Sequence, residues 1–253
     1  MSISNPNQNL KNPAQFYLDW NGAKGHLYYY DKEAQSNVIV NSPFYFVVMD
    51  ELNVITGFNK PTKSGIYSNE IRNTKTDPFR VRTFKGGNDF TGMYKEIKDR
   101  ITALSGKFTK SVYAYAKIND VFCTVNIKFS GAAFAQWLDF SKKNNQSFAS
   151  MGVVLKEAVE DSNGSITFLK PVFEIVNVRE ETIAGAVTMD KTLQMYLDSY
   201  LKRKPDDFEP TTVDYPEDHI PDDAYTDWNK SEAAKAGAEA LNSSNDSVDD
   251  LPF

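Results

Sequence analysis

The sequence predicts a mainly β fold with added helices, followed by an acidic tail. Two observations predict the folded part. Short apolar and aromatic runs are bounded by turn residues, and a few longer stretches have apolar residues at helical spacing. A third observation, the loss of apolar residues after Lys204, predicts the tail. We therefore expect one folded domain over residues 1–204 and a disordered acidic tail over residues 205–253.

The first half of the predicted domain consists of strands and turns. Its apolar runs are FYLDW, HLYYY, NVIV, FYFVVMD, NVITGF, GIY and FRVRTF. Turn residues such as Asn-Gly, Asn-Ser-Pro and Lys-Pro-Thr-Lys-Ser-Gly separate them. We interpret Asp50-Glu51, between two of these runs, as a turn at a strand end and not as a metal-binding carboxylate pair. The Lys85-Gly86-Gly87 turn is expected to connect the last strand to a helix.

In the second half of the domain, helices are interspersed with paired strands. Apolar residues at helical spacing predict a helix between Met93 and Gly106. Apolar and polar positions alternate over residues 107–118 and 121–129, on either side of Asn119-Asp120, which predicts a hairpin. The remaining expected elements are a helix over residues 132–142, strands near 151–157 and 166–178, and a helix over 186–203.

The order of these elements lacks the regular strand–helix alternation of a doubly wound sheet. A small Greek-key β-barrel of the oligonucleotide-binding type (OB-fold), enlarged by extra strands and helices, fits the order best. A β-sandwich is the alternative.

Charge is distributed very unevenly along the chain. The whole sequence has 28 Lys and Arg against 34 Asp and Glu, a net charge of minus 6. Residues 1–204 carry plus 6, whereas residues 205–253 carry minus 12, and residues 55–130 alone carry plus 8. A basic body therefore precedes an acidic tail, so the acidic average does not exclude a polyanionic partner.

Several function classes are excluded or disfavoured. Cys123 is the only cysteine and His26 and His219 the only histidines, so we expect neither a disulfide framework nor a metal site, and no cofactor. No phosphate-binding loop, dinucleotide fingerprint or hydrolase motif occurs, so we expect no enzyme. The chain also lacks a secretion signal and a run of about 18 apolar residues. We therefore expect a cytoplasmic protein without a membrane partner, in the host cytoplasm if it is viral.

The predicted hairpin has one apolar face and one face that combines aromatic, hydroxyl and basic side chains. Side chains of a strand alternate between its two faces. The apolar face includes Val112, Cys123 and Val125, and we expect Cys123 to be buried and inert. The opposite face carries Lys107, Tyr113, Tyr115, Lys117, Phe122 and Lys128. Single-stranded nucleic acid is bound by aromatic rings that stack on bases and by cations that contact phosphates, so this face is a candidate site.

The preceding segment repeats this combination. Arg80, Arg82 and Phe84 share one face of a predicted strand, and further cations lie in the loop region before it: Lys60, Lys63, Arg72 and Lys75. Tyr28 and Tyr30 also share a strand face, where cross-strand packing is an equally good interpretation. Trp20 and Trp137 are expected in the core.

The last five residues are the most specific motif. Asp249, Asp250, Leu251, Pro252 and Phe253 resemble the acidic tip of bacterial single-stranded DNA-binding proteins, which ends in Asp residues, Ile or Leu, and Pro-Phe. In that family the tip binds replication, recombination and repair proteins. The basic, β-rich body with its acidic tail is similar in architecture to bacteriophage single-stranded DNA-binding proteins. This second resemblance transfers no individual DNA contact.

We therefore expect a non-catalytic protein that binds and protects single-stranded DNA with little sequence preference. Its tip would recruit replication, recombination or repair proteins. The alternative is an adaptor or inhibitor that uses the same tip to bind host DNA-processing proteins without binding DNA. A nuclease is a third hypothesis, but it would need a carboxylate cluster that the sequence does not display.

Overall fold

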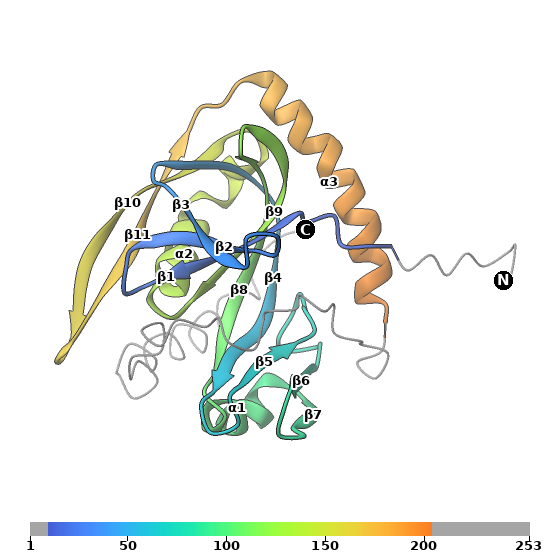
Figure 1. The fold of residues 1–253 in the computed structure, drawn as a ribbon. Coiled ribbons are helices and arrows are strands. Elements are labelled where there is room, and N and C mark those ends of the chain that lie inside the picture. Colours follow the sequence, from blue (N-terminus) through green and yellow to red (C-terminus); the bar gives the residue numbers. More distant parts are fainter. Residues whose placement is uncertain (1–9, 204–253) are drawn as a thin grey trace, which may run out of the picture.

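The computed structural model describes residues 10–203, which form one mixed β-sheet with helices packed against it (Figure 1). The prediction of a mainly β fold with added helices is therefore confirmed. The strands are β1 (Phe16–Asn21), β2 (His26–Asp31), β3 (Ser36–Val40), β4 (Phe44–Asn59), β5 (Ser64–Ser68), β6 (Phe79–Thr83), β7 (Asp89–Gly92), β8 (Gly106–Ile118), β9 (Val121–Ser130), β10 (Gly152–Asn163) and β11 (Ile166–Val176). The helices are α1 (Tyr94–Ala103), α2 (Gly131–Asn144), the short 3-10 helix η1 (Asn145–Ala149) and α3 (Glu180–Leu201).

The strands pair in the order β3-β2-β1-β9-β8-β4-β5-β6-β7. Strand β10 lies between β4 and β11 and pairs with both. β1 runs parallel to β9, whereas the neighbouring pairs are antiparallel. Within the described residues this path ends at β3 and β7 without closing. The sheet is therefore mixed, and the closed Greek-key barrel stays a prediction.

The long strand β4 replaces a predicted turn. The structure continues the strand through Asp50 and Glu51, with a bulge between Val48 and Asp50 in its pairing with β8. Each carboxylate has a polar partner that is distant in sequence: Asp50 pairs with Arg72, and Glu51 accepts a hydrogen bond from the indole of Trp137. Adjacent acidic residues therefore mark a strand with polar partners here, and the prediction of a turn is wrong.

The segment after β6 also differs from the prediction. Lys85-Gly86-Gly87 leads into the short strand β7 before α1 begins. Gly86 and Gly87 have φ values of 89° and 66°, which glycine adopts without a steric penalty. In β7 only Phe90 is buried. The alternation of buried and exposed residues over these four positions is too short to predict a strand from the sequence.

The hydrophobic core has three parts, each covered by a different helix. The largest surrounds Trp137 of α2, which is fully buried, and Trp20 packs against it, as predicted. A second part lies between α1 and β4 to β7, where Phe79 and Val81 are fully buried. The third part lies beneath α3, on the opposite face of β4 and β8.

Helix α3 begins at Glu180, six residues before the predicted start at Ala186. Glu180 and Glu181 lie in its first turn, where acidic side chains stabilise the positive end of the helix dipole. The apolar positions of this helix form one stripe, in which Leu193, Leu197 and neighbouring tyrosines are buried against Leu52 and Tyr113. None of the described helices has both the length and the apolar character needed to cross a membrane. The predicted acidic tail and its tip lie outside the described residues.

Candidate nucleic-acid interface

The two faces of the β8–β9 hairpin are sorted as the alternation predicts. Ala114, Ala116, Cys123 and Val125 are buried in the largest core cluster, and burial raises the pKa of the Cys123 thiol. The opposite face carries the predicted aromatic, hydroxyl and basic side chains. However, α3 lies across the middle of this face, so the candidate residues fall into separate groups.

Tyr113 lies in the covered part of this face. It has no exposed surface, and it packs with Leu193 and Leu197 of α3. Its hydroxyl donates a hydrogen bond of 2.7 Å to Glu70 Oε2 and accepts one of 2.9 Å from Asn12 Nδ2. Burial, reinforced by the charge of Glu70, raises the pKa of this hydroxyl well above its usual value. The expectation that Tyr113 lies on an open face is therefore wrong, because α3 covers it.

Polar groups around Glu70 help to hold α3 on the sheet. Ser111 Oγ donates to Glu70 Oε1 and accepts a hydrogen bond of 2.7 Å from Asn126 Nδ2. At the end of α3, the hydroxyl of Tyr200 accepts a hydrogen bond of 2.9 Å from the backbone N–H of Glu70. The bond between Glu70 and Tyr200 ties α3 to the segment after β5, and Ser111 and Asn126 are fully buried and closed to a ligand.

Beyond α3, basic and aromatic side chains gather on one face of strands β4, β5, β6 and β8. We call this the basic–aromatic face, and its members are Phe58, Tyr67, Arg80, Arg82, Phe84 and Lys107. The strand registers bring them together, because Thr56 pairs with both Tyr67 and Lys107, and Tyr67 pairs with Arg82. Helix α1 covers the reverse face of the same strands, at the lower end of the molecule in Figure 1.

The aromatic part of this face is centred on Phe84 and Tyr67. Their ring centroids are 4.6 Å apart, and Phe84 is 51% exposed. Gly65 provides the space for the Phe84 ring, since a Cβ at this position would lie 3.2 Å from it. Sequence analysis identified Phe84 but missed Phe58 and Tyr67. The alternation of Gly65, Tyr67 and their buried neighbours in β5 was the available signal, but the partner strand could not be known.

The two arginines of this face share one carboxylate. Arg80 makes a bidentate contact with Asp89, with Nε–Oδ1 and Nη2–Oδ2 distances of 2.8 and 2.7 Å. Arg82 Nε lies 3.3 Å from Asp89 Oδ2. The hydrogen bond from Arg80, with the charges of both arginines, lowers the pKa of Asp89. One acidic residue therefore orients two cations, and their combined charge stays positive.

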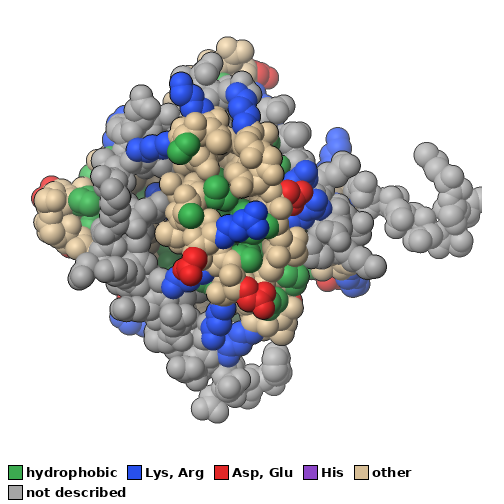
Figure 2. Space-filling view, turned by 90° about the horizontal axis from the view of Figure 1, so that it is seen from below, with side chains coloured by type: hydrophobic (Ala, Val, Ile, Leu, Met, Phe, Trp, Pro, Cys, Tyr) green, Lys and Arg blue, Asp and Glu red, His purple; other side chains and the backbone are tan. Residues whose placement is uncertain are grey.

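Lysines complete the positive charge of this end, one within the face and two beside it. Lys107 is half-buried, and desolvation lowers its pKa. Lys60 and Lys63 are exposed in the turn between β4 and β5. This turn lies against the β6–β7 turn: a Cβ at Gly86 would be only 2.9 Å from the Thr62 side chain. Seen from below, the described surface of this end displays Lys and Arg side chains at several points (Figure 2).

The other two predicted loop cations lie between β5 and β6, apart from Lys60 and Lys63. Lys75 is exposed in a turn there, whereas Arg72 binds Asp50 with Nη1–Oδ1 and Nη2–Oδ2 distances of 2.8 and 2.7 Å. Burial acts to raise the pKa of Asp50, but hydrogen bonds from Arg72 and Gln194 outweigh it and leave that pKa lowered. Arg72 is therefore held by β4, and the four cations lie in two separate loop regions.

A second group of candidates lies at the other end of the hairpin, near the start of α3. We call it the hairpin-tip patch, and it consists of Tyr45, Tyr115, Lys117 and Phe122. The rings of Tyr115 and Phe122 are stacked, with centroids 5.1 Å apart and planes within 14°. Lys117 Nζ is 2.9 Å from Asp120. Lys128 belongs to neither group, since its Nζ lies 5.8 Å above the ring centroid of Tyr17 in β1.

A groove of about 530 Å³ runs between α3 and the α2–η1 segment. Apolar side chains such as Val48 and Val187 line it together with Asp50, Glu51 and Asp190. Three carboxylates against one lysine, Lys142, in its lining disfavour a phosphate backbone here. No three His, Cys, Asp or Glu side chains of residues 10–203 form a group that could hold a metal ion.

No protein-family model, curated protein or solved structure matches the chain. Proposals about its function therefore depend on its own residues and their arrangement.

Proposed function

We propose that this protein binds single-stranded DNA, without catalysis and with little sequence preference. The observation that supports this most directly is the basic–aromatic face, where the Phe84–Tyr67 ring pair lies beside Arg82 on adjacent strands. Aromatic rings stack on any base, and cations contact phosphates that every sequence shares. The combination suits a strand whose bases are unpaired, because the bases of a duplex are already stacked within it. A Greek-key barrel of the oligonucleotide-binding type remains part of this proposal.

The acidic tail is proposed to recruit other proteins. Its last residues, Asp249 to Phe253, resemble the tip with which bacterial single-stranded DNA-binding proteins bind replication, recombination and repair proteins. An aromatic anchor next to a proline buries apolar area at a small entropic cost, and the aspartates add attraction to a basic pocket. Protection of single strands and recruitment of enzymes would then reside on one chain.

An adaptor that binds partner proteins without DNA is the second candidate. The pairing of both Arg80 and Arg82 with Asp89 favours it, because this carboxylate reduces the positive charge available to phosphates. The two functions predict opposite results in a DNA titration.

The test is titration of the full chain with oligo(dT), oligo(rU) and duplex DNA at several salt concentrations. The proposal predicts tight, salt-sensitive binding to oligo(dT) and much weaker binding to duplex. The variant Arg82→Gln is expected to weaken binding. Lys143→Gln is a matched control, since this lysine is exposed in the last turn of α2, on the opposite side of the sheet from α3. Absence of oligo(dT) binding would favour the adaptor.

A further inference from the structure

The hairpin-tip patch and the basic–aromatic face belong to the same side of the sheet. In the pairing of β4 with β8, Val47 is opposite Tyr115 and Thr56 is opposite Lys107, and both pairs face the side on which α3 lies. Helix α3 packs between them, with Gly185 against Tyr115 near its start and Tyr200 against Glu70 near its end. The two groups are therefore separated by a helix and not by the sheet.

The hairpin-tip patch is a preformed aromatic platform. The hydroxyl end of the Tyr115 ring fits against α3, since a Cβ at Gly185 would lie 2.7 Å from its oxygen. The other side of Tyr115 is covered by the stacked ring of Phe122, which is 45% exposed. Phe122 is thus the outer ring of a stack with fixed support, which lowers the entropic cost of adding another ring.

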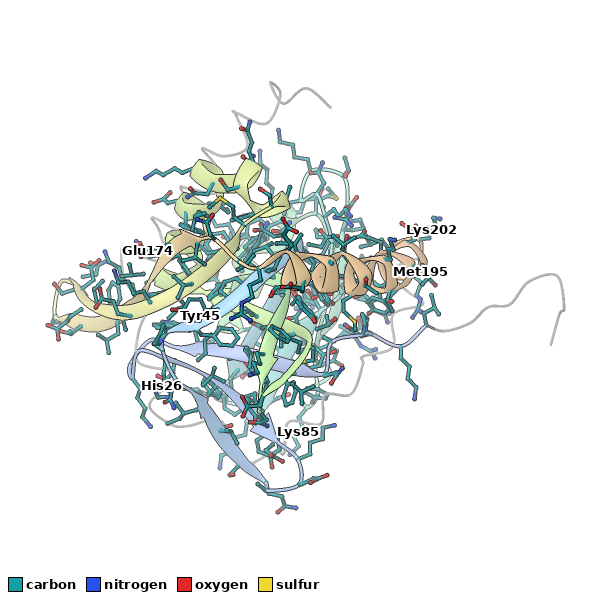
Figure 3. The ribbon with its side chains drawn as sticks, turned by 90° about the horizontal axis from the view of Figure 1, so that it is seen from above. His26, Tyr45, Lys85, Glu174, Met195 and Lys202 are labelled. Carbon is teal, nitrogen blue, oxygen red and sulfur yellow. The ribbon has the colours of Figure 1, made fainter. Side chains whose placement is uncertain are left out.

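Tyr45 and Lys117 complete the patch. Phe46 pairs with Ala116 on the core side, so the residues that precede and follow them, Tyr45 and Lys117, face the opposite side. Lys117 pairs with Phe122 across the hairpin, and Tyr45 is 55% exposed. Figure 3 shows Tyr45 beyond the first turns of α3, whereas Met195 and Lys202 lie toward its other end. The patch therefore repeats, on a smaller scale, the combination of rings and a cation found on the basic–aromatic face.

We infer that one single strand engages both groups and passes α3 between them, so that the binding site is bipartite. This inference rests on the proposed function. The shared chemistry of the two groups and their position on one sheet face favour a continuous strand over an unrelated partner. The substrate class is then single-stranded DNA long enough to reach both groups, and short fragments occupy only one of them.

The length of β8 gives the shortest path between the two groups. Ten residue steps separate Lys107 from Lys117, which corresponds to about 34 Å along a strand. About ten nucleotides cover this distance at the ~3.4 Å spacing of stacked bases, and an extended strand needs fewer. Once one group is occupied, the second binds at a high effective concentration. Affinity should therefore rise steeply with oligonucleotide length up to about ten nucleotides, while the second group comes within reach. Beyond that length it should rise only gradually, in proportion to the number of positions at which the longer strand can bind.

The experiment measures the affinity of the full chain for oligo(dT) of 4, 6, 8, 12 and 16 nucleotides. In the variant Phe122→Ala we expect the affinity for the 16-mer to fall about fivefold or more, the lower end of the effect of one stacking ring. Affinity for the 4-mer should change less, because the basic–aromatic face still binds it. Val121→Ala is the matched control, since Val121 is the adjacent residue, 63% exposed, and points to the other face.

Three results would overturn the inference. If Phe122→Ala and Tyr45→Ala bind the 16-mer as tightly as the wild type while Arg82→Gln binds it weakly, DNA binding stands but the site is not bipartite. If Phe122→Ala instead abolishes a concentration-dependent dimer seen by analytical ultracentrifugation, the patch is an interface between two copies. A wild-type chain that binds no oligonucleotide overturns the proposed function as well.

Discussion

The ring of Phe84, the residue that follows β6, packs beside the ring of Tyr67 in the neighbouring strand β5, with 4.6 Å between their centroids and a tilt of 39° between their planes. Phe84 is half exposed and rests on Gly65, so one face of its ring is supported by protein. A half-exposed ring contributes little to folding, since much of its surface stays in contact with water. The exposed half of this ring is the surface that the proposed DNA binding would use.

Replacing this ring should weaken DNA binding more than it weakens folding. We expect Phe84→Ala to reduce the affinity for oligo(dT) by about 1–3 kcal/mol, the usual contribution of one stacked base. Phe84→Trp should retain most of the affinity, because it keeps an aromatic surface. Fluorescence anisotropy with labelled oligo(dT) measures both. Ile39→Ala, at a residue of similar exposure on β3, is the control and should bind normally.

The negative charge of Asp89 should lower the affinity for DNA. Because Asp89 pairs with both Arg80 and Arg82, Asp89→Asn removes one negative charge from the face, and the attraction of both arginines to phosphates should increase. We expect tighter binding at low salt. The slope of log K against log salt should steepen by up to about 0.7 for each arginine that gains a phosphate contact. Weaker binding by this variant would contradict the prediction and indicate that Asp89 is needed to position the arginines.

Tyr113 should matter for stability and not for DNA binding. Tyr113→Phe removes a buried donor to Glu70 and the acceptor of the Asn12 amide, so we expect a loss of about 1–3 kcal/mol of folding free energy. Such a loss lowers the thermal midpoint by about 2–4 °C per kcal/mol in a chain of this size. Oligo(dT) affinity should not change at temperatures where the variant is folded. A selective loss of affinity would instead mean that α3 opens to expose this ring.

Local alternation predicted which residues share a strand face, and the structure agrees for the β8–β9 hairpin. The buried side of Cys123, the hairpin itself and the apolar stripe of α3 all follow from period-two or helical spacing. These predictions succeed because they depend only on where a side chain points relative to its sequence neighbours.

The predictions that failed depend on contacts between distant residues. The apolar stripe of α3 indicates that the helix packs on an apolar surface. It does not indicate that this surface includes Tyr113, which lies 80 to 90 positions before the stripe in the chain. In the same way Asp50-Glu51 was interpreted as a turn, since the partners that make a strand favourable there, Arg72 and Trp137, are far along the chain. Tyr67 was missed because only the pairing of β5 with β6 places it beside Arg82.

The ion pair of Asp50 with Arg72 should make stability depend on acid pH. The folded-state pKa of Asp50 is lowered from 3.8, so its contribution is fully present above pH 3.8 and is lost as the pH falls through the lower folded value. Near neutral pH we expect Asp50→Asn to cost about 1 kcal/mol, since Arg72 is partly exposed. The difference in thermal midpoint between the wild type and this variant should shrink below pH 3.8. A difference that stays constant down to pH 2.5 would show that the charge of Asp50 does not contribute.

Removing the acidic tail should tighten DNA binding and abolish partner binding. Residues 205–253 carry a net charge of minus 12 against plus 6 in residues 1–204, and a tethered acidic segment is expected to compete with phosphates at a high effective concentration. Without the tail, the affinity for oligo(dT) should therefore rise at low salt, with a smaller gain as salt screens the charges. Phe253→Ala in the full chain is the matched variant: it should lose partner binding and keep wild-type affinity for DNA. Unchanged or weaker DNA binding after truncation would show that the tail does not compete with DNA.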